Sequence, residues 1–146
     1  MDNPADSYRS AADIEQIVMQ FESCTLPRKA WTHRAHVTVA VWYLSRQEQP
    51  EAIRSIRRSI RRYNESCGIA GGAGGGYHET ITMFYMRVLR LYLDGLGAHA
   101  SLVERTNAAV HRFGAGNLPL EYYSPERLMS PQARAQWVEP DLKPLE

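Results

Sequence analysis

Apolar residues recur every three or four positions through five segments of this chain, and Gly, Pro or Ser residues separate the segments. This spacing places the apolar side chains on one face of an α-helix, which has 3.6 residues per turn. No segment shows the alternation of apolar and polar residues that is typical of a strand. We therefore expect an all-α fold, an irregular bundle of about five helices followed by one or two short C-terminal helices.

Residues that favour helix ends predict where these helices begin and end. Ser10 and Thr32 are N-cap candidates, and Pro50 suits a first helical turn. Two Ser-Pro pairs, at 124–125 and 130–131, predict the two short helices in the same way. We expect the five main helices to run from Ala11 to Phe21, from Thr32 to about Gln47, from Gln49 to about Cys67, from His78 to Leu93 and from about Ser101 to Phe113.

Length and composition exclude several classes of protein. A chain of 146 residues suits a single helical domain, residues 1–146, and we expect residues 1–9 to be a mobile tail. A net charge of +1 argues against a dedicated nucleic-acid binder, and no apolar run is long enough to span a membrane. The polar N-terminus lacks the features of a signal peptide, and Cys24 and Cys67 suggest reduced thiols. These features predict a cytoplasmic protein.

Three histidines are the candidate metal ligands. His33 and His36 are three residues apart, so they project from the same side of the second helix, the side that carries its apolar residues. His78 stands at the head of the apolar face of the fourth helix. Neutral imidazole is the commonest metal ligand in proteins. We expect the three rings to hold a divalent first-row metal ion, namely Zn, Fe, Mn, Ni or Cu, unless they are helix-start residues satisfied by backbone groups or solvent.

Residues near these histidines are candidates for catalysis and substrate binding. Glu79 follows His78 and is the predicted general base; the alternatives are a further metal ligand, a partner of a ligand, or an acidic residue that complements the helix dipole. Tyr63, Asn64 and Tyr77 are the predicted substrate-binding residues. Other tyrosines that could line a pocket are Tyr85, Tyr122 and Tyr123, although a tyrosine on an apolar face more often packs in the core.

Two further segments have several interpretations each. The glycine-rich loop at 68–76 is foremost a flexible connection; a lid over the histidines and a cradle for an anion are the alternatives. The five arginines of the third helix lie largely away from its apolar face, which predicts a solvated surface. An anionic partner or a homodimer contact is the alternative for that surface.

The sequence also resembles a family of small, uncharacterised bacterial proteins. The resemblance rests on five motifs that are spread over most of the chain and comprise Trp31 to His36, Arg62 to Asn64, Tyr77 to Thr82, Tyr122 to Pro125 and Trp137 to Leu142. It supports one intact domain and implies no activity, cofactor or site residue.

These observations lead to a functional hypothesis and two alternatives. The hypothesis is a small metal-dependent enzyme, in which the three-histidine site acts on a small molecule by hydrolase, lyase or oxygenase chemistry. The first alternative is a non-catalytic helical protein that binds a ligand or a partner, with structural or anion-binding histidines. The second is a homo-oligomeric module that uses its arginine surface for an acidic partner.

Overall fold

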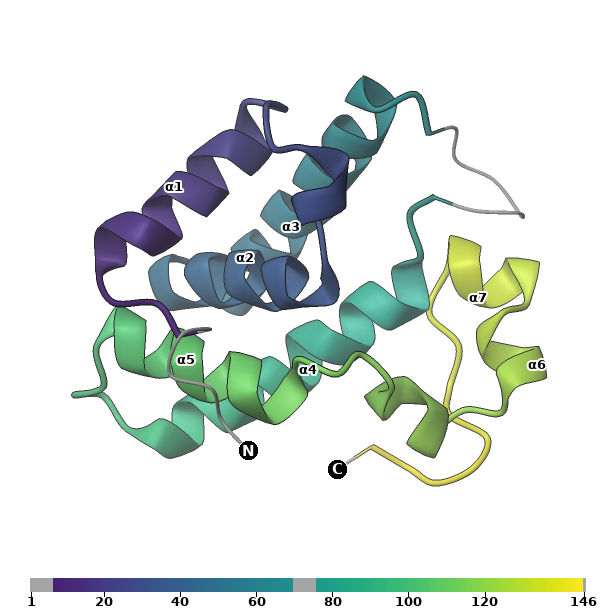
Figure 1. Cartoon of the computed structure of the whole chain (residues 1–146). Coiled ribbons are helices and arrows are strands. Elements are labelled where there is room, and N and C mark those ends of the chain that lie inside the picture. Colours follow the sequence, from purple (N-terminus) through teal and green to yellow (C-terminus); the bar gives the residue numbers. More distant parts are fainter. Residues whose placement is uncertain (1–6, 70–75, 146) are drawn as a thin grey trace.

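The computed structural model describes residues 7–69 and 76–145, and all regular structure within them is helical (Figure 1). The main helices are α1 (Ala11–Glu22), α2 (His33–Arg46), α3 (Gln49–Ser66), α4 (Glu79–Leu96) and α5 (Leu102–Phe113). Two short helices, α6 (Pro125–Leu128) and α7 (Pro131–Ala135), follow in the C-terminal segment. The 3-10 turns are η2 (Arg28–Ala30) and η3 (Leu118–Glu121). The predicted all-α fold is confirmed.

The helices begin where the capping residues predict. The side chain of Ser10 accepts a hydrogen bond from the backbone N–H of Asp13, and Thr32 accepts one from Ala35. Ser101 forms a capping box with Glu104 at the start of α5. Each cap satisfies a backbone donor that the helix itself leaves unpaired, so the first residue of the helix is fixed locally.

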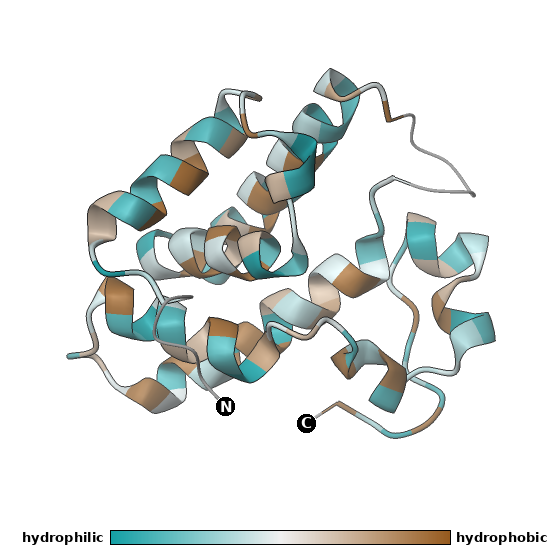
Figure 2. Cartoon of the chain, viewed as in Figure 1, coloured by the Kyte–Doolittle hydropathy of each residue, from teal (hydrophilic) through white to brown (hydrophobic). Residues whose placement is uncertain are grey.

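Helix α2 is the centre of the bundle, since it contacts α1, α3, α4 and α5. Its buried residues lie on more than one side and include Val37, Val39, Ala40 and Val41. Figure 2 shows that the other long helices mix hydrophobic and hydrophilic residues along their length, as expected for helices with one face in the core. The start of α2, which carries both candidate histidines, is therefore held from several directions.

Helix α4 is buried on two sides, whereas its apolar pattern predicts one. Tyr85 and Leu89 follow His78 at helical spacing and are buried on the apolar face that it heads, but Thr80 and Phe84 are also buried. The second buried side arises because the C-terminal segment packs on α4: the Thr80 hydroxyl donates to the carbonyl of Gln136, 2.9 Å away (Figure 1). This contact fixes the first turn of α4, next to His78.

Two segments differ from the prediction. Tyr8, expected in a mobile tail, is anchored to α5, because its N–H donates to the Asn107 side chain at 2.8 Å and its carbonyl accepts from it at 2.9 Å. Helix α4 continues past Leu93 to Leu96 and ends at Gly97, whose φ of +89° suits glycine. Residues 70–75 of the glycine-rich loop and residues 1–6 lie outside the described residues.

Candidate functional site

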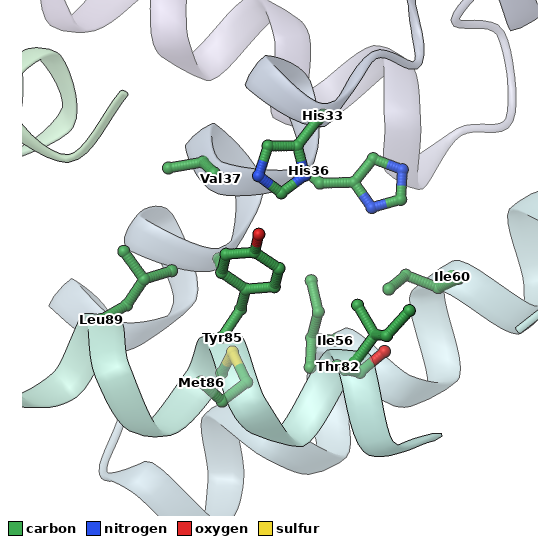
Figure 3. Close-up of a pocket in the computed structure, with 11 residues that line it drawn as sticks. His33, His36, Val37, Ile56, Ile60, Thr82, Tyr85, Met86 and Leu89 are labelled. Carbon is green, nitrogen blue, oxygen red and sulfur yellow. The ribbon is translucent and has the colours of Figure 1, made fainter. Parts of the chain in front are cut away.

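Two adjoining pockets lie where α2, α3 and α4 meet. The smaller one, here called the inner pocket, has a volume of about 60 Å³ and is lined mainly by apolar side chains around His33, His36, Thr82 and Tyr85 (Figure 3). The larger one, the outer pocket, has a volume of about 430 Å³. Its lining residues are Arg28, Trp31, His36, Ile60, Tyr63, Asn64, Ile69, Gly76, Tyr77, His78, Ile81 and Thr82.

The two pockets share one wall. His36, Ile60, Ile81 and Thr82 line both of them. His36 therefore faces both pockets.

His33 lies in the inner pocket with one ring nitrogen occupied. Its Nε2 donates a hydrogen bond to the carbonyl of Phe113, at 2.9 Å. Because a carbonyl oxygen only accepts, the neutral ring keeps Nδ1 as an acceptor. Burial lowers the pKa of His33, and the Phe113 bond opposes this shift only in part. Gly116, at φ +80°, leaves room for the ring, since a Cβ there would lie 3.1 Å from it.

His36 has no hydrogen-bond partner for its ring among the described residues. The ring stacks on Trp31, with centroids 3.8 Å apart, and Trp31 stacks in turn on Phe21 at 4.2 Å. Burial, with a smaller contribution from the nearby His33, lowers the pKa of His36 to about 3. The ring is therefore neutral at physiological pH, and it offers one N–H donor and one nitrogen acceptor to whatever occupies the pockets.

Tyr85 contributes a buried hydroxyl that is also unpaired. Only 7% of the residue is exposed, and the hydroxyl has no hydrogen-bond partner within the described part of the chain. Figure 3 shows the hydroxyl pointing toward His33 and His36, and the rings of Tyr85 and His33 lie 4.8 Å apart. Burial raises the pKa of Tyr85 to about 12, and the nearby backbone of Leu118 opposes this shift only in part. The phenol thus stays protonated and can donate.

His78, the third predicted metal ligand, is the N-cap of α4. Its Nδ1 accepts from the backbone N–H of Ile81 at 3.1 Å, and its Nε2 donates to the carbonyl of Leu128 at 2.7 Å. Both nitrogens are thus used by the backbone, so the ring has no free lone pair for a metal ion. The structure brings His33 and His36 to one pocket but does not add His78 as a third donor. No group of three or more His, Cys, Asp or Glu residues in the described ranges is arranged to hold a metal ion.

Glu79, the predicted general base, is held in an ion pair outside both pockets. Arg57 donates from Nε and from an Nη atom to its two carboxylate oxygens, at 3.1 and 2.6 Å, and the Tyr77 hydroxyl donates at 2.6 Å. Burial by itself would raise the pKa of Glu79, but the bonds from Arg57 and Tyr77 outweigh it and leave the pKa below its usual value. A carboxylate so stabilised is a weak base, and the pocket-lining residues do not include it.

All three predicted substrate-binding residues line the outer pocket, but only one has an unpaired side chain. The Tyr63 hydroxyl donates to the Leu26 carbonyl at 2.7 Å, and the Tyr77 hydroxyl is bound to Glu79. The amide of Asn64 has no hydrogen-bond partner among the described residues. The sequence therefore indicates which residues line this pocket better than which of them can bind a ligand.

Sequence reasoning missed one charged residue of the site. Arg28 lies in η2 and lines the outer pocket, and no motif in the sequence distinguishes it from the other arginines. The one sequence signal for the position of Arg28 is Pro27, which directly precedes it and is the N-cap of η2.

Comparisons with models of protein families, with curated protein sequences and with solved structures found no match to this chain. In the described residues, no helix combines the length and the apolar character needed to cross a bilayer.

Proposed function

We propose that this chain binds a small organic molecule in the inner and outer pockets. The observation that carries the proposal is the Tyr85 hydroxyl, which is buried, unpaired and directed into the inner pocket beside the unpaired ring of His36 (Figure 3). A buried polar group without a partner costs about 1–3 kcal/mol of stability. A ligand that accepts a hydrogen bond from Tyr85 removes that cost on binding.

The lining of the inner pocket supports a ligand with a compact apolar part. Most of its side chains are aliphatic, among them Ile56, Ile60, Met86 and Leu89. A few polar groups in an otherwise apolar pocket are the usual composition of a small-molecule site, because the apolar surface supplies affinity and the polar groups fix orientation. The inner pocket, at about 60 Å³, is the smaller of the two, so a ligand larger than this apolar part extends into the outer pocket.

The test is a fragment screen against the protein and two variants. Ligand-observed NMR with a few hundred fragments should give hits whose binding is weakened by Tyr85→Phe, which removes only the hydroxyl. Tyr92→Phe is the matched control, because Tyr92 lies on the same helix and lines neither pocket. If no fragment binds, or if Tyr85→Phe and Tyr92→Phe have the same effect on every hit, the proposal is wrong.

A metal-dependent enzyme is the second candidate. It is favoured by the two neutral rings of His33 and His36 in the inner pocket, each with a nitrogen free of hydrogen bonds to described residues. A metal ion binds only the unprotonated imidazole, so a lowered pKa removes competition by protons. A divalent first-row ion held there would polarise a bound oxygen atom or water. His78 would join only after giving up a bond to the backbone.

Metal analysis of untagged protein separates the two candidates. Near-stoichiometric metal that is lost in His33→Ala and His36→Ala supports the metal centre. If His78→Ala also loses the metal, all three predicted histidines are ligands. If His78→Ala retains it, the histidine ligands are His33 and His36 on α2. If the protein contains no metal and still binds fragments, the metal-dependent enzyme is excluded and the ligand-binding proposal stands.

A further inference from the structure

We infer that the molecule bound is a small carboxylic acid, whose carboxylate lies between Arg28 and Asn64 in the outer pocket and whose apolar body reaches the inner pocket. This inference rests on the proposed function and adds the chemical class of the ligand. It comes from the charges and the unpaired groups of the outer pocket.

The outer pocket carries a positive charge that no acidic residue balances. Arg28 is the one charged residue among those that line it, and no Asp or Glu lines either pocket in the described part of the chain. The Arg28 guanidinium makes no ion pair or hydrogen bond with another described side chain. Arg28 is exposed, so water solvates its guanidinium in the ligand-free protein, and an anion in this pocket would be its first charged partner.

Two neighbouring arginines do not compete for that role. Arg57 is neutralised by Glu79, and the guanidinium of Arg61 lies over the Tyr77 ring, 4.7 Å from its centroid. Arg61 does not line the outer pocket, so its charge adds to the positive potential there without a direct contact. The charge that can touch a ligand is that of Arg28 alone.

The unpaired amide of Asn64 complements this charge. The backbone carbonyl of Asn64 accepts from the N–H groups of Cys67 and Ile69, so the end of α3 is satisfied without its side chain. The amide is left to donate to a ligand in the pocket that it lines together with Arg28. One guanidinium and one amide suit the two oxygens and single charge of a carboxylate, whereas a phosphate dianion usually meets more than one cation.

The apolar surface beside Arg28 and Asn64 indicates that the rest of the ligand is apolar. Ile60 and Ile81 line both pockets, so an apolar surface continues from the outer into the inner pocket. A monocarboxylate with a short alkyl or aryl body fits these pockets, because its charged end would lie at Arg28 and its apolar body along Ile60 and Ile81. A polar substituent on the body could then meet His36 or the hydroxyl of Tyr85 (Figure 3).

Isothermal titration calorimetry with matched probes tests the inference. The acids are butanoate, hexanoate, octanoate, phenylacetate and 3-phenylpropanoate, each compared with its primary amide and with the amine of the same body. We expect at least one acid to bind about tenfold or more tighter than its amide, because a hydrogen bond to a charged group is worth about 1.5–3 kcal/mol. Arg28→Gln should abolish that preference without weakening the amide. Added salt should weaken the acid alone.

Lys29→Gln is the matched control, because it removes one positive charge from the same turn at a residue that lines neither pocket. If amides bind as tightly as acids, or if Arg28→Gln and Lys29→Gln act alike, the inference is wrong. Tighter binding of hexyl phosphate than of hexanoate also overturns it. Amides that bind equally well and lose affinity in Tyr85→Phe would leave the proposed function intact, whereas a protein that binds no probe and no fragment would refute both.

Discussion

Acid should destabilise this protein through His36. In the folded chain its pKa is about 3, since burial and then the nearby His33 disfavour the charged ring, against 6.5 for an ordinary histidine. Between these two values the unfolded chain takes up a proton on residue 36 and the folded chain does not. The free energy of unfolding must therefore decrease as the pH falls from about 6.5 toward 3.

The size of this effect follows from the two pKa values. At pH 7 little of the unfolded chain is protonated at His36, whereas at pH 5 nearly all of it is. Integrating the difference in bound protons gives a loss of about 2 kcal/mol between pH 7 and pH 5. The stack on Trp31 acts in the opposite direction, because an aromatic face attracts a cation by about 0.5–1 kcal/mol at a partly exposed site.

Urea unfolding at pH 7 and at pH 5, followed by tryptophan fluorescence, measures this loss. The wild type should lose about 1–2 kcal/mol more than His36→Gln over the same interval. Each variant is compared with itself at the two pH values, so a change in its stability at pH 7 does not enter. His99→Gln is the control, since His99 is exposed, and it should behave as the wild type. Equal losses in the wild type and His36→Gln would refute the reasoning and mean that the folded protein accommodates the imidazolium on Trp31.

Three further substitutions test the geometry of the site by their effect on thermal unfolding. Tyr85→Phe should make the ligand-free protein about 1–3 kcal/mol more stable, because it removes an unpaired buried hydroxyl; a loss of stability would mean that the hydroxyl has a partner. Gly116→Ala should cost about 1–3 kcal/mol, since alanine is strained at φ +80° and its Cβ would press on His33; a change under 0.5 kcal/mol would contradict this. Thr80→Val should cost about 1–3 kcal/mol, because the Gln136 carbonyl loses its buried donor; unchanged stability would mean that this contact does not hold the C-terminal segment.

The elements that local rules govern could be predicted from the sequence. Ser10 and Thr32 cap the helices that follow them, because a hydroxyl can accept from a backbone N–H three residues later whatever the rest of the fold does. The spacing of His33 and His36 likewise fixes their common side on α2. The second buried side of α4 could not be predicted, since it depends on where residues far along the chain dock.

His78 shows the limit of the same reasoning at the site. Its place at the head of α4 suggests a side chain directed inward, and the ring does line the outer pocket. Whether its nitrogens are free is a different question, and the answer depends on the Ile81 N–H and on the Leu128 carbonyl, which lies 50 residues away. The expected helix begins at His78, whereas the structure makes His78 the N-cap of a helix that begins at Glu79.

The groups that remain unpaired define how ligand binding and folding are coupled. His36 lies on α2, Asn64 on α3 and Tyr85 on α4, so a ligand that spans the two pockets and bonds to all three connects the three helices. The unfolded chain cannot present these groups together. A bound acid at 100 times its Kd should therefore raise the free energy of unfolding by about 2.7 kcal/mol. Because each bond ends on a different helix, removing any one of the three side chains should reduce this stabilisation, even where the substitution leaves the ligand-free protein unchanged.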